Sequence, residues 1–170
     1  YDRTATPLTA RLEAEGAIIH YEDDLSLIPP QFLEKDTVVV YTPAVPADHT
    51  EMCHYRNGGY RMLKRSQMLG EITRGQRCMA VAGTHGKTTT STLLAHIYTH
   101  SGVGCSAFLG GISKNYRTNL LLSKNPVLVA EADEFDRSFL QLFPHVAIIT
   151  STDADHLDIY GDVDTIRGAF

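Results

Sequence analysis

The residue types best suited to chemistry lie in one glycine- and threonine-rich segment near the middle of the chain. It reads Gly83-Thr84-His85-Gly86-Lys87-Thr88-Thr89-Thr90 and joins an apolar run to an amphipathic one. Glycines allow backbone N–H groups to curl around phosphate oxygens, and the start of a helix adds partial positive charge. We expect Lys87 to reach the β- and γ-phosphates of ATP and the Thr88 hydroxyl to bind Mg²⁺.

This segment departs from the general phosphate-loop pattern GxxxxGK[ST] at its first position, where the chain has Val81. A Gly/Thr turn that closes a strand–helix unit is therefore an alternative interpretation. The order of strand, loop, Lys-Thr pair and helix is nevertheless the context that a phosphate loop requires, and it favours ATP binding.

A cluster of carboxylates follows a later apolar run, PVLVA. It reads Glu131-Ala132-Asp133-Glu134-Phe135-Asp136, and in open α/β sheets ligands bind at the carboxyl ends of the strands. Four carboxylates so close together repel one another unless a cation lies among them. We expect Glu131, which directly continues the strand, to bind a metal; for the other three a solvated acidic turn is an equal alternative.

A second polar group follows the apolar run VAIIT and reads Asp153-Ala154-Asp155-His156-Leu157-Asp158. A neutral imidazole among carboxylates can accompany a Mg²⁺ site, although an isolated histidine is more often structural. His156 is thus a second candidate residue for the metal site.

The second half of the chain supplies the elements that must position these residues. The pattern predicts strands at 77–82, 126–130 and 146–150, the last two buried, and a helix at 88–101. Leu93, Leu94, Ile97 and Tyr98 would form the apolar stripe of that helix, and Asp162 would cap a final helix.

The first half alternates in the same way. Helices are predicted at 6–15, 47–56 and 66–73, and strands at 17–21, 36–42 and 60–63. The strand at 36–42 is a continuous β-branched run, as expected of a strand buried on both faces. The alternation predicts a doubly wound α/β fold, and because the pattern restarts at Gly75-Gln76 we predict two parts, 1–75 and 76–170.

The bulk composition excludes several classes of function. The 170 residues are 43% hydrophobic and 21% charged, with a net charge of −5, which argues against nucleic-acid or anionic-membrane partners. Three separated cysteines form neither a disulfide framework nor a CxxC metal site, and the two that lie within apolar runs are expected to be small buried thiols. Because the chain has no apolar run of 18 residues, we expect no membrane insertion. We expect a cytoplasmic location instead.

The variant loop GTHGKTTT resembles the phosphate loop of the Mur ligase family, which has GT-x-GK-T in place of the general spacing. His85 at the variable position is similar to the alanine-adding branch of that family and to its tripeptide-recycling relative. The pair EADE and D-H-x-D, with 25 residues from Glu131 to His156, resembles two further family motifs. The chain departs from the family pattern at Ser151, where asparagine is usual, and at Asp153, where glutamate is usual.

This resemblance implies a fold, cofactors and site residues. Residues 1–75 would be part of a Rossmann-like UDP-sugar-binding domain, and 76–170 the first half of a P-loop-type α/β ATPase domain. ATP and Mg²⁺ would be the cofactors, with Thr88 on a first Mg²⁺ and Glu131 and His156 on a second. Lys87, Glu131 and His156 would be catalytic, and the ATP site would comprise Gly83, Thr84, His85, Gly86, Lys87, Thr88 and Thr89.

The resemblance also implies a reaction, in which ATP phosphorylates the lactyl carboxylate of UDP-N-acetylmuramate and the amine of L-alanine attacks the acyl phosphate. This step belongs to the synthesis of peptidoglycan precursors. Three alternatives stay open: recycling of a tripeptide onto the same sugar nucleotide, a P-loop hydrolase or switch protein, and a nucleotide-binding module without ligase activity.

Three residues are weaker candidates for the sugar-nucleotide site. Thr42 ends a predicted strand at the edge where a nucleotide would bind. Thr118 and Asn119, together with Gly110-Gly111, resemble a family segment that lines the site, although a Gly-Gly turn and a polar loop explain them nearly as well. Because the chain begins with Tyr1 and ends at Phe170 within a predicted helix, we expect a piece of a longer protein that does not ligate by itself.

Overall fold

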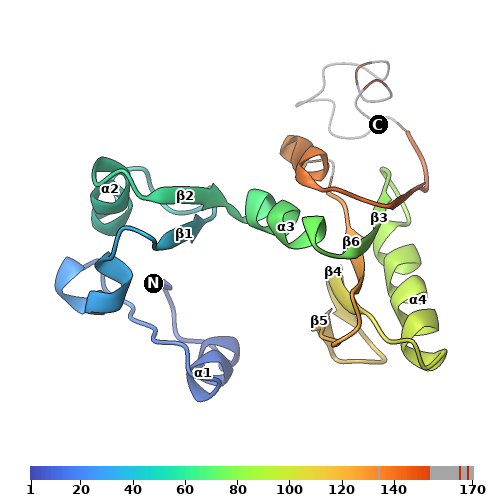
Figure 1. The fold of residues 1–170 in the computed structure, drawn as a ribbon, viewed down its shortest axis with the longest axis horizontal. Coiled ribbons are helices and arrows are strands. Elements are labelled where there is room, and N and C mark those ends of the chain that lie inside the picture. The colour runs from blue at the N-terminus through green and yellow to red at the C-terminus, as the bar shows by residue number, and fades with distance from the viewer. Residues whose placement is uncertain (134, 154–164, 166–167, 169–170) are drawn as a thin grey trace. The chain divides into compact units, whose positions relative to one another are not determined.

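The computed structural model describes residues 1–133, 135–153, 165 and 168 (Figure 1). Several predicted features lie outside these residues, among them Glu134, Asp155, His156, Asp158 and the helix that Asp162 was expected to cap. The chain divides into two compact units, Tyr1–Arg65 and Ser66–Phe170.

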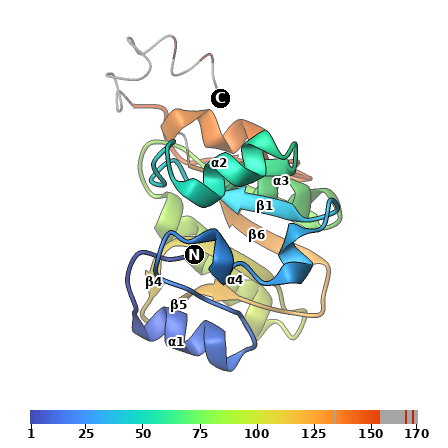
Figure 2. The same cartoon turned by 90° about the vertical axis from the view of Figure 1, so that its left-hand side faces the viewer.

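The first unit contains two helices and a two-stranded parallel ribbon (Figures 1 and 2). Its elements are α1 (Pro7–Ala14), 3-10 turns at Leu25–Leu27 and Pro30–Leu33, β1 (Val38–Tyr41), α2 (Thr50–Asn57) and β2 (Arg61–Lys64). Helix α1 begins as predicted, because Pro7 occupies its first turn and the Thr6 hydroxyl accepts a hydrogen bond from the Thr9 N–H.

Three predictions for this unit need correction. Residues 17–21 form no strand, because a strand requires a ladder partner. Here the Ala17 N–H donates to the Leu12 carbonyl and the His20 carbonyl accepts from the Asp2 N–H. Strand β1 is not buried on both faces, since Val38 and Val40 are 42% and 47% exposed and β2 is its paired strand. Helix α2 begins at Thr50 rather than 47, because a turn follows Pro46.

The second unit is built on a mixed five-stranded sheet in the order β5-β4-β6-β3-β7. Its elements are α3 (Arg65–Arg74), β3 (Arg77–Ala82), α4 (Lys87–His100), β4 (Ser106–Ser113), β5 (Thr118–Leu121), β6 (Val127–Glu131), a 3-10 segment (Phe135–Gln141) and β7 (Val146–Ile149). All neighbouring strands are parallel except β4 and β5. The predicted strands at 77–82, 126–130 and 146–150 and the helix after the loop are confirmed within one residue at each end.

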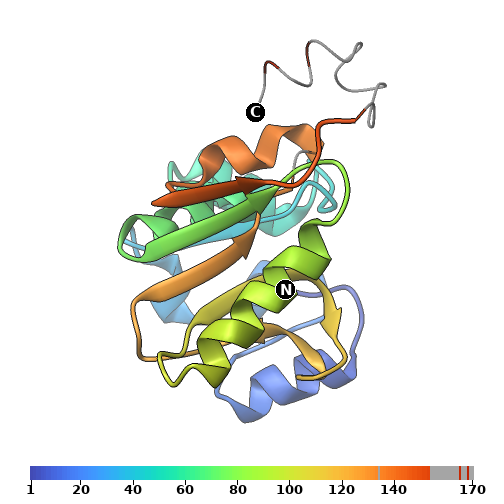
Figure 3. The same ribbon diagram turned by 90° about the vertical axis from the view of Figure 1, so that its right-hand side faces the viewer.

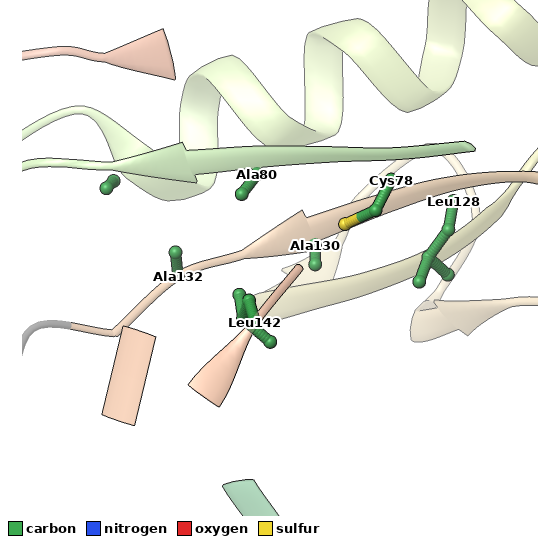
Figure 4. Packing of buried hydrophobic residues seen from close by; sticks show 7 residues of the cluster. Cys78, Ala80, Leu128, Ala130, Ala132 and Leu142 are labelled. Atoms are coloured by element: carbon green, nitrogen blue, oxygen red, sulfur yellow. The ribbon is translucent and has the colours of Figure 1, made fainter. Parts of the chain in front are cut away.

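Both faces of this sheet are covered, which explains why β6 is an uninterrupted apolar run. Alternate residues of β3 and of the chain through β6 form a buried cluster, which Leu142 completes (Figure 4). Its other members are Cys78, Ala80 and Ala82 of β3, Leu128 and Ala130 of β6, and Ala132 directly after β6. Side chains from α3 and the 3-10 segment pack against this cluster. Helix α4 lies along the other face, where it covers Val127, Val129 and Ala107 (Figure 3).

Only two of the four residues predicted to form the apolar stripe of α4 face the sheet. Leu94 and Tyr98 pack on the sheet, but Leu93 and Ile97 are 57% and 55% exposed. Fully buried Ser91 and Ala95 complete the inner face instead, because small side chains allow the helix to lie close to the strands. The hydrophobic pattern alone does not reveal which of two adjacent apolar residues turns inward.

Two further expectations concern strands of the second unit. Strand β7 was expected to be buried, but Val146 and Ile149 are 50% and 49% exposed. The reason is that β7 is the edge of the described sheet. The Gly110-Gly111 pair forms no turn, since both residues lie within β4.

The cysteines behave as small apolar residues. Cys78 and Cys105 are buried and unpaired, as predicted. Burial raises the pKa of the Cys78 thiol to about 11, so this group is protonated at neutral pH and a poor nucleophile.

Candidate functional site

The glycine- and threonine-rich loop joins the carboxyl end of β3 to the first turn of α4. Gly83 and Gly86 have φ angles of 124° and 81°, which residues with a side chain rarely adopt. A Cβ atom on Gly83 would also collide with Thr150 and with the backbone of Ser151. Both glycines are therefore required by the path of the chain, and they direct the amino end of α4 toward the loop.

The end of β7 holds this loop in place. The Thr84 N–H donates to the Ser151 carbonyl at 3.0 Å, and the Ser151 hydroxyl lies 2.8 Å from the Thr84 hydroxyl and accepts from the His85 N–H at 2.9 Å. The Thr150 hydroxyl donates to the Ala82 carbonyl at 3.1 Å. Ser151, which the sequence marked as a departure from the family pattern, thus fixes the loop through its hydroxyl group.

Lys87 bends back over the loop from the first turn of α4. Its ammonium group donates to the Gly83 carbonyl at 2.7 Å and lies 3.4 Å from the Thr84 carbonyl. The side chain is half-buried. A positive charge is therefore held at the mouth of the loop by the loop itself, where phosphate oxygens would complement it.

Glu131 lies beside the loop because of the strand register. In the parallel pair of β3 and β6, Glu131 is opposite Val81, two residues before Gly83. Its carboxylate accepts hydrogen bonds from the Thr88 hydroxyl at 2.8 Å, the Gly110 N–H at 2.7 Å and the Ser91 hydroxyl at 3.3 Å. Three donors from two elements, α4 and β4, thus orient this one carboxylate.

Gly110 is needed for this arrangement. A Cβ atom at this position would overlap the carboxylate of Glu131, whereas a Cβ on the neighbouring Gly111 would meet the Thr88 methyl group at 3.4 Å. Neither Gly110 nor Ser91 was assigned to the metal site from the sequence. The Gly110-Gly111 pair was the available signal, but its contact with Glu131 depends on β4 pairing with β6.

The donor set fits a hard divalent cation and a bound nucleotide. Thr88 donates its hydroxyl proton to Glu131, so the oxygen lone pairs stay available to a metal. Hydroxyl and carboxylate oxygens are the ligands that Mg²⁺ prefers. Among the described residues, this carboxylate accepts hydrogen bonds from two hydroxyl groups and one backbone N–H. Mg²⁺ with a triphosphate is therefore compatible with the residues present.

The other predicted residues are distributed as follows. His85 and Thr89 belong to the loop and the first turn of α4 and are exposed. Thr118 and Asn119 begin β5, and β4 and β6 lie between that strand and β3. Thr42 follows β1 in the first unit. His156 lies outside the described residues, and so its place relative to Glu131 stays a prediction.

Comparison with protein families matches nearly the whole chain. The family described as Mur ligase middle domain matches residues 81–170, and the one described as Mur ligase family, catalytic domain, matches residues 1–77. The family resemblance read from the loop is thereby confirmed.

Individual relatives give the same family. A protein named UDP-N-acetylmuramate–L-alanine ligase from Porphyromonas gingivalis is 58% identical over 172 residues, covering all of this chain and 38% of the relative. One of the same name from Cytophaga hutchinsonii is 53% identical over 175 residues with the same coverage. The chain thus spans about 38% of the length of the curated relatives that it matches.

Solved structures agree with the described fold. UDP-N-acetylmuramate:L-alanyl-γ-D-glutamyl-meso-diaminopimelate ligase from Neisseria meningitidis matches 98% of this chain and 56% of its own, with a TM-score of 0.80 and 27% identity. UDP-N-acetylmuramate–alanine ligase from Thermotoga maritima matches 78% of this chain and 31% of its own, with a TM-score of 0.67 and 33% identity. Separately, none of the described helices has the length and apolarity needed to cross a membrane.

Proposed function

Because this chain belongs to the Mur ligase family, we propose that it takes part in the ADP-forming ligation of L-alanine to the lactyl carboxylate of UDP-N-acetylmuramate, an early step in peptidoglycan precursor synthesis. The observation that carries the proposal is the convergence of Lys87, Thr88 and Glu131 at the carboxyl end of β3. The choice of L-alanine as acceptor rests on the names of the relatives that are more than 50% identical.

The residues of the loop are assigned to ATP and to Mg²⁺. Gly83, Thr84, His85, Gly86, Lys87, Thr88 and Thr89 bind the phosphates, Thr88 binds one Mg²⁺, and Glu131 and His156 bind a second. The geometry around Glu131 supports its part in this assignment. When bound, the metal ions supply positive charge that neutralises the phosphoryl oxygens during transfer.

The chain's own part in the reaction is alignment and charge stabilisation. The ammonium of Lys87 faces the position where charge develops on the transferred phosphoryl group. Ser151 and Thr150 keep the loop from moving, since their hydroxyl groups bind its backbone. A fixed loop spares the reaction the cost of orienting these groups, and such preorganisation is a large part of enzymatic rate enhancement.

The remaining assignments concern the two parts of the chain. We propose that 1–75 belongs to the UDP-sugar-binding domain and 76–170 to the central ATP-binding domain. The family matches at 1–77 and 81–170 support this division, while the first compact unit of the structure ends at Arg65. Thr42, Thr118 and Asn119 stay proposed contacts of the sugar nucleotide.

A second function is favoured by one observation. The Neisseria protein, whose structure has the higher TM-score of the two described above, is named as a ligase for a tripeptide-type acceptor, L-alanyl-γ-D-glutamyl-meso-diaminopimelate. Its 27% identity is well below that of the alanine ligases, so the alanine reaction is preferred.

The test is ADP release by the full-length protein that contains this chain, with Mg²⁺, ATP and UDP-N-acetylmuramate present. Release that requires L-alanine is expected, and Lys87→Ala should lower it about 100-fold or more because a cation at the transferred phosphoryl group is lost. Lys124→Ala, at an exposed lysine before β6, is the matched control and should keep full activity. Release only with the tripeptide would establish the second function, and release with neither would contradict both.

A further inference from the structure

A second group of potential metal ligands lies in the unit Tyr1–Arg65. Asp23, His49 and Glu51 each bring one ligand atom to a common point, and these atoms all lie within 4.8 Å of one another. His49 and Glu51 flank the first residue of α2, and Asp23 comes from the segment that precedes the 3-10 turn at Leu25–Leu27. None of them is assigned a part in the proposed ligase reaction.

The imidazole of His49 is buried without a hydrogen-bond partner. Only 8% of His49 is exposed, and the same holds for Glu51. The Nδ1 atom of His49 lies 3.2 Å from the Oδ1 atom of Asp23, but neither ring nitrogen makes a hydrogen bond to any residue that the structure describes. Buried polar atoms are nearly always satisfied, and a bound ion is one of the standard explanations for an exception.

The spacing fits ligands that point toward a third atom rather than toward each other. Two ligands placed about 2.0 Å from a tetrahedral zinc ion are about 3.3 Å apart. The 3.2 Å between His49 Nδ1 and Asp23 Oδ1 matches this value, and a carboxylate oxygen of Glu51 lies within 4.8 Å of both ligand atoms.

Both carboxylates are oriented by further hydrogen bonds, as metal-binding carboxylates usually are. The Nε2 atom of His20 lies 2.6 Å from the Oε1 atom of Glu51. The Thr50 N–H donates to Asp23 Oδ2 at 2.8 Å. The ring of Tyr1 packs edge-on against His49, with 4.4 Å between the ring centroids.

We propose that Asp23, His49 and Glu51 bind a zinc ion, with His20 as the hydrogen-bond partner of Glu51 and water as the fourth ligand. Zinc is the ion of choice because one imidazole and two carboxylates suit it, whereas Mg²⁺ and Ca²⁺ require oxygen ligands throughout. The ion joins the segment before the first 3-10 turn to the start of α2. This proposal uses no residue of the phosphate loop and is independent of the ligase reaction.

The experiment measures Zn²⁺ binding by the chain after metals have been removed with a chelator. Zn²⁺ competes with a chromophoric chelator in the presence of excess Mg²⁺, and Co²⁺ serves as a spectroscopic substitute. One Zn²⁺ per chain is expected, together with the visible absorption of a tetrahedral Co²⁺ site. His49→Ala should weaken Zn²⁺ binding about 100-fold or more, and His20→Ala, which removes only the supporting partner, about 10- to 100-fold.

Glu51→Gln is a second ligand variant that keeps the shape of the side chain and so guards against loss of folding, which circular dichroism checks for each variant. His100→Ala, at an exposed histidine of α4, is the control and should bind Zn²⁺ normally. Unchanged Zn²⁺ affinity in both His49→Ala and Glu51→Gln would overturn the proposal. The group would then consist of two histidine–carboxylate pairs without a metal, His20 with Glu51 and His49 with Asp23. Loss of binding only in His100→Ala would also overturn it, since the ion would then bind α4.

Discussion

At the scale of single residues, the candidate site depends on groups that hold other groups in place. Glu131 accepts bonds from Thr88, Ser91 and the backbone of Gly110, and Ser151 binds the loop through its hydroxyl. The sequence predicts Glu131 and Thr88 as metal ligands from their types and positions, and the structure brings them within 2.8 Å of each other. Sequence reasoning missed Ser91 and gave no part to Ser151, because a serine carries no signal until its neighbours are known.

Gly110→Ala tests this dependence. The added methyl group overlaps the end of the Glu131 side chain, which is flexible enough to move away at small cost to the fold. We therefore expect Mg²⁺-dependent ATP turnover by the full-length protein to fall about tenfold or more, while the free energy of unfolding changes by less than about 1 kcal/mol.

The matched control for this variant is Gly75→Ala. A Cβ atom at Gly75 has no neighbour within 4 Å, so activity and stability should both be preserved. Unimpaired turnover in Gly110→Ala would show that the position of Glu131 beside β4 does not matter to the reaction.

At the scale of elements, the five-stranded sheet of the second unit explains which residues meet. Strand β3 lies between β6 and β7, so the loop that follows it is flanked by the carboxyl ends of both neighbours. Helix α4 packs on one face and α3 on the other. The attachment of α3 includes one fully buried polar group, the hydroxyl of Thr73, which accepts from the Phe143 N–H at 3.0 Å and donates to the Gly70 carbonyl at 2.6 Å.

Thr73→Val keeps the shape of this side chain but leaves the Phe143 N–H without its partner. An unsatisfied buried donor costs about 1–3 kcal/mol, so the free energy of unfolding measured in urea should fall by that amount. Thr99→Val is the comparison: its hydroxyl bonds to the Ala95 carbonyl of its own helix at 2.8 Å, and the change should stay within about 0.5 kcal/mol. Equal stability of both variants would contradict the role given to Thr73.

At the scale of the whole molecule, the residues proposed to bind ATP and Mg²⁺ lie in a chain that spans about 38% of the length of its curated relatives. In the proposed function, nucleotide binding uses only groups of the second unit, whereas ligation would also require a bound sugar nucleotide and an amine acceptor. The two activities are therefore expected to separate when the chain is assayed by itself.

The 170-residue chain should bind MgATP but should not release ADP in response to L-alanine and UDP-N-acetylmuramate. Binding is measured by the quenching or polarisation of a fluorescent ATP analogue, with Lys87→Ala as the variant that weakens it. A coupled ADP assay on the same sample gives the second measurement. Alanine-dependent ADP release by the chain alone would contradict this prediction.

The sequence by itself determined the elements whose signals are local. These are the strand at 77–82, the glycine loop, the helix that follows it, and the apolar strand that ends in Glu131. Such features depend on the conformational preferences of neighbouring residues, which the sequence states directly. Only the tertiary structure decided that Glu131 lies beside Val81, that Ser151 holds Thr84, and that β1 and β7 are half exposed despite their apolar residues. Burial and pairing depend on which distant segment lies alongside a strand, and β-branched residues favour a strand equally at the centre and at the edge of a sheet.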